Sequence, residues 1–325
     1  MSTEFERIAR WFLPLDQPAA TPPPLLGNGD DALAVRTDQV QVMSIDASVS
    51  GTHFPAGASA EDVASKALRA ALSDLAAMGA RPWFYTLSVV VPTFFPETWW
   101  EEFGQALARE NQLWQLPCLG GDTAAGELLV VTIQVHGLCE RPLTRSQALS
   151  GDDVWVAGTL GGSGGGLKCL LGNRNSRNTA AQQALMDDFY RPVLPLALMA
   201  ELSPIVNAAI DVSDGLLADL GHILEASHCG AKLALEHLPM TQALVSEFGV
   251  VAARELALSG GEDFAVCFTA PRAQREAIMT RADGLDTPVT RIGKITEISG
   301  CELTLKGLPY VRPDAHKQKG YDHFV

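Results

Sequence analysis

The sequence has few basic residues for its size. Lysine and arginine total 24 against 38 aspartates and glutamates, so the formal net charge of the 325 residues is −14. Because nucleic-acid binding depends on lysine and arginine side chains that meet phosphates, this balance argues against a nucleic-acid partner and against an anionic membrane surface. Nucleotides stay possible, because a bound metal ion inverts the local field.

Long apolar runs and paired cysteines are also missing. No apolar stretch reaches the roughly 18 residues that a membrane span needs. No secretory signal is visible, since Glu4 and Glu6 come early. The six cysteines form no Cys-x-x-Cys pair, as expected for reduced thiols in a cytosolic protein. We therefore expect a cytoplasmic protein without a membrane partner.

Several catalytic motifs are absent as well. The sequence contains neither His-Glu-x-x-His nor Gly-x-Ser-x-Gly, so nucleophilic hydrolase chemistry is not supported. The glycine-rich stretch 158–166 is not a phosphate-binding Walker A loop, because Lys168 follows Leu167 and Cys169 stands where serine or threonine is needed. This stretch could be a mobile loop over a ligand or a place where a helix packs closely on a strand.

The length and the order of the patterns predict two domains. A single core rarely grows past roughly 250–300 residues. The polar segment 141–150 contains Pro142 and separates an expected domain over residues 1–140 from a second over 141–325. Strand and helix patterns alternate, which predicts an α/β class (α+β, with mixed sheets). Periodicity predicts helices over 4–13, 61–78, 96–114 and 216–226, and strands over 32–35, 40–45, 83–91, 128–135, 154–157, 209–212 and 264–269.

Six aspartates beside glycine or other small residues are the most informative feature that is present. They are Asp30, Asp46, Asp74, Asp122, Asp211 and Asp214. Folding could bring them into one cluster, which would be unstable without a positive charge. Oxygen ligands suit Mg²⁺, which usually holds substrate phosphates through a few carboxylates. The aspartates therefore predict a metal-dependent phosphate site.

Each motif also has a simpler structural interpretation. Gly27 to Asp31 could be a tight turn, as could Gly151-Asp152-Asp153, which also precedes a strand but has no further acidic motif beside it. Asp74 could lie on an exposed helix face, and residues 120–123, placed in a loop, could be a turn. Ser213 or Asp214 could merely cap the next helix, although a helix N-terminus also attracts phosphate. A lone histidine such as His53 is more often structural.

The order of the motifs is specific where each motif alone is not. The chain contains, in sequence, Gly-Asp-Asp, Ser-Ile-Asp with Gly-Thr-His-Phe, Ser-Asp-Leu-Ala-Ala-Met-Gly, Gly-Gly-Asp-Thr, Gly-Asp-Asp-Val-Trp-Val-Ala-Gly-Thr-Leu-Gly, Asp-Val-Ser-Asp-Gly-Leu and Ser-Gly-Gly-Glu-Asp-Phe. This series resembles the thiamine-monophosphate kinase family from about Gly27 to the C-terminal Gly-Tyr-Asp-His-Phe.

The resemblance implies a two-domain fold like that of aminoimidazole ribonucleotide synthetase, in which the N-terminal domain binds ATP and Mg²⁺ and forms a barrel in a homodimer. It implies transfer of the ATP γ-phosphoryl group to thiamine monophosphate. The residue roles also come from the resemblance. Asp46, Asp122 and Asp211 would be catalytic. Gly121, Asp122, Arg145 and Ser213 would bind ATP, and His53, Glu262 and Tyr321 would bind thiamine monophosphate. The metal ligands would be Asp30, Ser44, Ile45, Asp46, Asp74, Asp122, Asp211 and Asp214.

Two positions depart from the family pattern. Ile45 stands where threonine is common, so a metal contact there would have to use the backbone. Tyr321 stands where tryptophan is frequent.

Two alternatives remain open: a sister ATP-dependent enzyme acting on another acceptor, and a non-enzymatic protein that binds Mg²⁺ or nucleotide. The selenium enzyme of this superfamily needs an early cysteine and the hydrogenase maturation factor a C-terminal one, whereas the first cysteine here is Cys118 and the tail ends at Val325.

Overall fold

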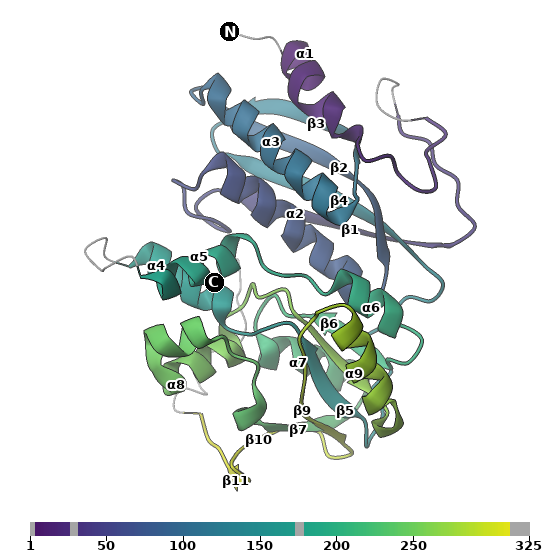
Figure 1. Ribbon diagram of the computed structural model, residues 1–325, viewed down its shortest axis with the longest axis vertical. Helices are drawn as coiled ribbons and strands as arrows, with labels where there is room; N and C mark the ends of the chain where they lie inside the picture. The colour runs from purple at the N-terminus through teal and green to yellow at the C-terminus, as the bar shows by residue number, and fades with distance from the viewer. Residues whose placement is uncertain (1–3, 27–31, 173–178, 313–325) are drawn as a thin grey trace. The chain divides into compact units, whose positions relative to one another are not determined.

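A computed structural model describes residues 4–26, 32–172 and 179–312 (Figure 1). The chain divides into two compact units. The first comprises Met1–Leu75 and Ala80–Glu140, and the second comprises Ala76–Gly79 and Arg141–Val325. Both units combine helices with a β-sheet, so the expected mixed α/β class is confirmed.

The first unit is built on a four-stranded sheet in the order β1-β4-β2-β3. Its strands are β1 (Val40–Val49), β2 (Arg81–Pro92), β3 (Cys118–Gly126) and β4 (Val130–Cys139). β4 pairs antiparallel with β1 and β2, whereas β2 and β3 are parallel because helix α3 (Glu97–Trp114) connects them. Helix α2 (Ala60–Ala77) connects β1 to β2.

The two faces of this sheet differ. Val131, Ile133 and Val135 alternate along β4 and are fully buried. Met43 and Ile45, which point the other way from β1, are 59% and 66% exposed. Strand side chains alternate between faces, so one face of the sheet is covered. The second face is open around Met43 and Ile45 but covered near Phe84, where Ala20, Leu33 and Val35 join one apolar cluster. Figure 1 shows α2 and α3 lying side by side over the sheet.

A buried ion pair joins the two helices. The Arg69 guanidinium donates to both carboxylate oxygens of Glu110, at 3.0 and 2.9 Å, and the Trp114 indole N–H donates to the same carboxylate at 2.8 Å. A buried carboxylate is tolerated because these charge-assisted bonds replace its hydration.

The N-terminal segment departs from expectation. The helix expected over 4–13 is an α-helical turn, α1 (Glu4–Arg7), followed by a π-helical turn, η1 (Ile8–Phe12), and a 3₁₀ turn, η2 (Leu13–Asp16). The strand expected over 32–35 was wrong: Ala34 makes only an isolated bridge with Leu26. With a single bridge, the apolar residues 32–35 have no neighbouring strand to extend a ladder.

The second unit contains a seven-stranded sheet in the order β11-β10-β7-β9-β5-β8-β6. The strands are β5 (Asp153–Ala157), β6 (Ala208–Asp211), β7 (Gly230–Ala234), β8 (Val266–Ala270), β9 (Val289–Thr296), β10 (Gly300–Leu305) and β11 (Leu308–Pro309). β10 and β7 are parallel, and the other neighbours are antiparallel. The main core lies between strand residues such as Val156 and Leu233 and helix residues such as Leu220 and Leu258.

The helices of the second unit are α4 (Gly162–Leu171), α5 (Ala180–Tyr190), α6 (Leu196–Leu202), α7 (Leu216–Ala226), α8 (Gln242–Ser259) and α9 (Arg275–Gly284), with 3₁₀ turns η3 (Leu235–His237) and η4 (Arg272–Gln274). The glycine-rich stretch forms the start of α4. A Cβ on Gly164 would lie 3.0 Å from the Cα of Gly260, and one on Gly166 would overlap the carbonyl oxygen of Leu185. The glycines therefore permit close packing of α4, chiefly against α5 and the end of α8.

None of the helices in the described ranges is long and apolar enough to cross a membrane.

Candidate functional site

Two of the predicted metal ligands, Ser44 and Asp74, are in contact in the first unit, and a third, Asp46, shares a strand face with Ser44. Ser44 and Asp46 lie two residues apart on β1 and therefore share one face of the strand. The Ser44 hydroxyl donates a hydrogen bond to the carboxylate of Asp74 on α2. Asp74 is thus not on a fully exposed helix face; its side chain is half-buried and meets the β1 face that carries Asp46. Ile45 alternates to the opposite face and is exposed.

Asp122 and Gly121 lie on a strand and not in a loop as expected. β3 runs from Cys118 to Gly126 and forms the edge of the sheet beside β2. Asp122 is the register partner of Ser88 and is exposed. A Cβ on Gly121 would overlap the carbonyl oxygen of Leu87, so glycine permits the close approach of the two strands. Periodicity missed β3 because small residues carry no apolar alternation.

His53 has a clear structural contact. It lies in the turn that follows β1, and its Nδ1 accepts a hydrogen bond from the backbone N–H of Val49 at 3.0 Å. This bond assigns the proton of a neutral ring to Nε2.

In the second unit, two loops meet at the ends of β6 and β8. The backbone N–H of Glu262 donates to the carbonyl of Ser213 at 2.7 Å, and that of Phe264 donates to the carbonyl of Val212 at 2.9 Å. Segment 211–215 and segment 260–264 are therefore held side by side. This arrangement brings Asp211, Ser213 and Glu262 into one region.

Asp219 organises the first of these loops. One oxygen of its carboxylate accepts the backbone N–H groups of Ser213 and Asp214, each at 3.0 Å. The alternative in which Ser213 or Asp214 caps the helix was wrong, because Gly215 is the N-cap residue and no side chain caps α7 there. Sequence reasoning missed Asp219; its place in the first turn of a helix behind Asp-Gly was the available signal.

Burial, together with the negative charges of Asp211 and Asp214, raises the pKa of Asp219 to about 7, although the two backbone N–H donors act the other way. Proximity of like charges is the kind of environment that a divalent cation relieves. This part of the site is therefore rich in negative charge.

The second loop has a similar buried carboxylate. Asp263 is buried and accepts the backbone N–H groups of Gly161, at 2.6 Å, and Ser163, at 3.1 Å. Its neighbours Glu262 and Phe264 both have positive φ angles, 56° and 50°. Such strain persists only where the surrounding structure enforces it, and it is frequent at functional sites. The bonds to Asp263 link the Glu262 loop to the start of α4.

Arg145 lies in the segment that runs along β6. Thr144 forms a parallel bridge with Ala208, and the Arg145 carbonyl accepts a hydrogen bond from the Ser227 hydroxyl at 2.9 Å. The Arg145 side chain is exposed. Its backbone is therefore fixed while its guanidinium can reach a ligand.

Asp152 and Asp153 have structural partners. The Asp152 carboxylate accepts the backbone N–H of Leu149 at 3.0 Å and the side-chain N–H of Asn207 at 2.8 Å. Asp153 forms ion pairs with Arg275 and Arg291. These contacts support the structural interpretation of this Gly-Asp-Asp motif.

Two predicted residues, Asp30 and Tyr321, lie outside the described residues. Among the residues that the structure does describe, no group of three or more His, Cys, Asp or Glu side chains is close enough to hold a metal ion. The donor chemistry nevertheless fits Mg²⁺ in each unit. The first unit offers the Ser44, Asp46 and Asp74 oxygens, and the second offers the charges of Asp211 and Asp214 that raise the pKa of Asp219.

Family models cover both units. The model for the AIR synthase related protein, N-terminal domain, matches residues 29–139, and the model for the C-terminal domain matches residues 150–306. Together with the two-sheet fold, these matches define an AIR synthase related protein.

Comparison with similar proteins identifies the family within the AIR synthase related proteins. The thiamine-monophosphate kinase of Escherichia coli (strain K12) is 38% identical over 330 residues, which cover 99% of this chain and 98% of the relative. The crystal structure of thiamine-monophosphate kinase from Stenotrophomonas maltophilia K279a is 38% identical with a TM-score of 0.81, covering 88% of this chain and 92% of that one. AaThiL complexed with AMPPCP and TMP is 27% identical with a TM-score of 0.77, covering 100% and 99%. The chain belongs to the thiamine-monophosphate kinase family.

Proposed function

We propose that this protein transfers the γ-phosphoryl group of ATP to thiamine monophosphate and releases thiamine diphosphate and ADP. The observation that carries this proposal is the 38% identity to the Escherichia coli thiamine-monophosphate kinase over 99% of the chain. The similar AaThiL fold is known with AMPPCP, an ATP analogue, and TMP. The reaction makes the protein a phosphotransferase with a phosphate group as acceptor.

The chemistry agrees with the residues at the site. The acceptor is a phosphate oxygen that is ionised at neutral pH, so no catalytic base is needed. That oxygen forms a bond to the γ-phosphorus, and the bond from the γ-phosphorus to the bridging oxygen of ADP breaks. The protein must hold two anions in line and neutralise their charge.

Aspartates would hold the Mg²⁺ that accompanies the phosphates. In the first unit we assign this role to Asp46, Asp74 and Asp122, with Ser44 and the Ile45 backbone beside them. In the second unit we assign the same Mg²⁺-binding role to Asp211 and Asp214. Asp30 is the last of the proposed Mg²⁺ ligands. Mg²⁺, when bound, supplies the positive charge that stabilises a transferring phosphoryl group.

The remaining roles concern the two substrates. Gly121, Arg145 and Ser213 are proposed to contact ATP. The Nε2 side of His53 and the carboxylate of Glu262 are proposed to contact thiamine monophosphate, together with Tyr321. A carboxylate suits the positive thiazolium ring, and an aromatic ring can stack on a cation.

We further propose a cytoplasmic homodimer. The open face of the first unit's sheet exposes Met43 and Ile45, which are 59% and 66% exposed. Exposed apolar side chains on a sheet face favour association. Pairing of N-terminal domains through this face is consistent with the barrel that the family resemblance implies.

A coupled ADP-release assay with ATP, Mg²⁺ and thiamine monophosphate tests the proposal, with the product identified by chromatography. Thiamine diphosphate that forms only when all three are present supports it. ADP without thiamine diphosphate would favour a sister enzyme with another acceptor. A folded, Mg²⁺-binding protein that releases no ADP would favour the non-enzymatic alternative.

A further inference from the structure

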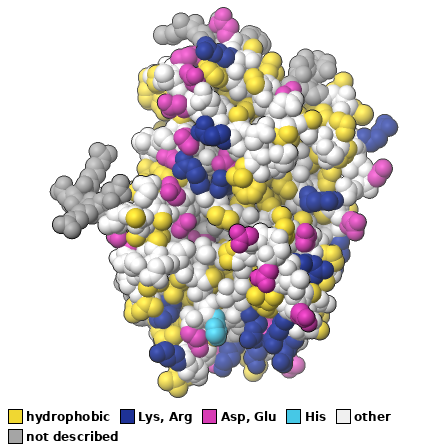
Figure 2. Space-filling view, viewed as in Figure 1, with side chains coloured by type: hydrophobic (Ala, Val, Ile, Leu, Met, Phe, Trp, Pro, Cys, Tyr) yellow, Lys and Arg dark blue, Asp and Glu magenta, His cyan; other side chains and the backbone are white. Residues whose placement is uncertain are grey.

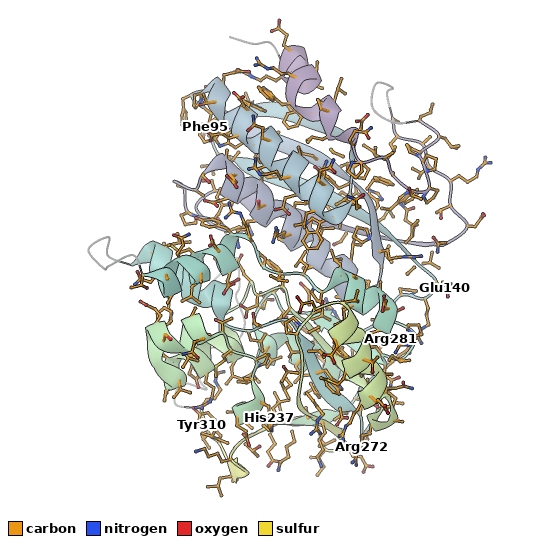
Figure 3. The ribbon with its side chains drawn as sticks, viewed as in Figure 1. Phe95, Glu140, His237, Arg272, Arg281 and Tyr310 are labelled. Atoms are coloured by element: carbon orange, nitrogen blue, oxygen red, sulfur yellow. The ribbon has the colours of Figure 1, made fainter. Side chains whose placement is uncertain are left out.

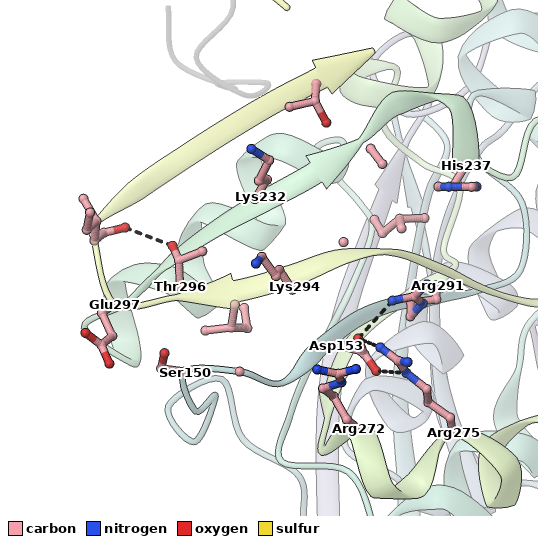
Figure 4. Close-up of a pocket in the computed structure, with 17 residues that line it drawn as sticks. Ser150, Asp153, Lys232, His237, Arg272, Arg275, Arg291, Lys294, Thr296 and Glu297 are labelled. Atoms are coloured by element: carbon pink, nitrogen blue, oxygen red, sulfur yellow. Dashed lines mark hydrogen bonds and ion pairs between the residues drawn. The ribbon is translucent and has the colours of Figure 1, made fainter. Parts of the chain in front are cut away.

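The second unit contains a pocket that none of the proposed kinase residues line. Its volume is about 900 Å³, and it lies against strands β5, β7, β9 and β10 and the turn η4 that precedes α9 (Figure 4). The lining includes no phenylalanine, tyrosine or tryptophan. The pocket adjoins one motif from the sequence analysis, Gly151-Asp152-Asp153. The aspartates of that motif have the structural partners described above.

Cationic side chains line this pocket from three directions. Lys232 comes from β7, Lys294 and Arg291 from β9, and Arg272 and Arg275 from the start of the α9 region. The anionic side chains of the lining are Asp153 and Glu297, so the formal charge of the lining is +3 with His237 neutral. A concentration of positive charge is unusual in a chain whose net charge is −14. Dark blue lysine and arginine side chains gather near the lower end of the second unit in Figure 2, where Figure 3 labels Arg272 and His237.

The strand register places like charges opposite each other. Lys232 and Lys294 are direct antiparallel partners, and Glu302 and Asp153 flank them on the neighbouring strands. Lys232 alternates with the core residues Ala231 and Leu233 and so projects from the outer face of the sheet. Like charges directly opposite on a sheet are destabilising. An anion between the two ammonium groups would remove that repulsion.

Not all of the positive charge is neutralised within the protein. Asp153 accepts from Arg275 at 2.5 and 2.6 Å and from Arg291 at 3.3 Å, so one carboxylate faces two guanidinium groups. Glu302 accepts from Lys232 at 2.7 Å. No hydrogen bond or ion pair is found for the side chains of Lys294 and Arg272 among the described residues. Both side chains are exposed.

The geometry points to a second anion site in this pocket, which binds a small di- or triphosphate group through Lys294, Arg272, Lys232 and Arg291. Arginine and lysine are the residues that recognise phosphate oxygens. Because no aromatic ring lines the pocket, it recognises the phosphate chain and offers no stacking surface for a base or a thiazolium ring. The ligand class therefore includes inorganic polyphosphates and the phosphate tails of nucleotides.

Isothermal titration calorimetry with inorganic tripolyphosphate tests this site. The titration is done on the whole chain in EDTA, which suppresses Mg²⁺-dependent binding at the aspartates. The double variant Lys294→Gln/Arg272→Gln is compared with Lys168→Gln/Lys306→Gln, which removes the same charge from exposed positions outside the pocket. We expect the wild type and the control to bind equally, and the pocket variant to bind at least about tenfold more weakly. The affinity should fall as salt is added.

Equal affinity of the pocket variant and the wild type would overturn the proposal, as would the absence of any binding to the wild type. Titration of ATP and of thiamine diphosphate under the same conditions separates the sources of the phosphate chain. A ligand whose binding the pocket variant weakens occupies this site. Kinase turnover by the pocket variant should equal that of the wild type, so failure of this proposal is distinguishable from failure of the proposed function.

Discussion

Ser44 on β1 donates its hydroxyl hydrogen bond to the carboxylate of Asp74 on α2. The two residues are 30 positions apart in the chain, and their bond joins the sheet of the first unit to the helix that covers it. It also places the Asp74 carboxylate against the strand face that carries Asp46. A polar contact in this position suggests a role other than simple packing.

Replacement of Asp74 by asparagine tests that role. The amide keeps the shape and can accept the Ser44 hydrogen bond, so we expect the fold to be retained while the Mg²⁺ concentration needed for half-maximal activity rises. Activity as a function of Mg²⁺ concentration measures this, with circular dichroism as the check of folding. Ser44→Ala is the companion variant, since it removes the bond but leaves the charge. An unfolded Asp74→Asn protein would instead indicate a structural role.

Asp122 should matter more than its exposed position on an edge strand suggests. We expect Asp122→Asn to lower kcat by about 10²-fold or more, because loss of one group that stabilises transition-state charge costs that much in other enzymes. Steady-state kinetics at saturating Mg²⁺ measures the effect. Asp38→Asn removes the same charge from an exposed residue of the first unit and is expected to leave kcat unchanged. Wild-type activity of Asp122→Asn would contradict its assignment as a metal ligand.

Substitution of Gly121, with Gly120 as the control position, tests how closely strands β2 and β3 approach each other. A methyl group at position 121 would overlap the Leu87 carbonyl oxygen, whereas one at position 120 would lie 3.6 Å from Thr86 Cγ2, an ordinary contact. We expect Gly121→Ala to lower the free energy of unfolding by about 1–3 kcal/mol, the usual cost of overpacking. Gly120→Ala should change it by much less. Urea denaturation of both variants gives the comparison, and equal stabilities would disprove the close strand approach.

Asp219 is expected to act as a positioning residue. Its carboxylate oxygen accepts two backbone N–H groups from the Ser213–Asp214 loop. Asparagine offers one oxygen for the same two donors, whereas alanine leaves them without this acceptor at a cost of about 1–3 kcal/mol for each buried group. We therefore expect Asp219→Ala to raise the KM for ATP and Asp219→Asn to stay near wild type. Equal kinetics of the two variants, both measured on folded protein, would refute this role.

The raised pKa of Asp263 leads us to expect that the stability of the folded protein depends on pH. Burial raises the pKa of its carboxyl group to about 7 against an unfolded value of 3.8, although the N–H groups of Gly161 and Ser163 lower it. The folded state therefore holds a proton that the unfolded state has released. Stability from this group is complete below the unfolded pKa and is lost as the pH rises toward 7, with a slope of at most about 1.4 kcal/mol per pH unit.

Thermal unfolding between pH 5 and pH 8 without Mg²⁺ measures this dependence. The wild type should lose stability between pH 5 and 7, and Asp263→Asn, which cannot titrate, should show a smaller slope. The half-buried Asp188, whose pKa burial and the nearby Asp187 raise to about 6, and Asp219, whose pKa is raised to about 7, act in the same direction and remain in the variant. An identical slope in both proteins would show that Asp263 does not titrate in this range.

The mixed α/β class, most of the regular elements and the family could be predicted from the amino-acid sequence alone. Helix α7 begins and ends where its apolar period predicts, because one clear stripe faces the core. The ordered aspartate motifs identified the family because each is local and can be recognised without the fold.

The contacts between residues that are distant in the sequence could not be predicted and are known only from the folded chain. Strand β3 forms from small residues because β2 pairs with it, and no local pattern encodes that pairing. The buried carboxylates of Asp219 and Asp263 acquire their roles from backbone N–H groups that folding presents to them. The cationic pocket likewise depends on sheet register, which places Lys232 beside Lys294 although they are far apart in the sequence. Such roles depend on burial and distance, which arise only when the chain has folded.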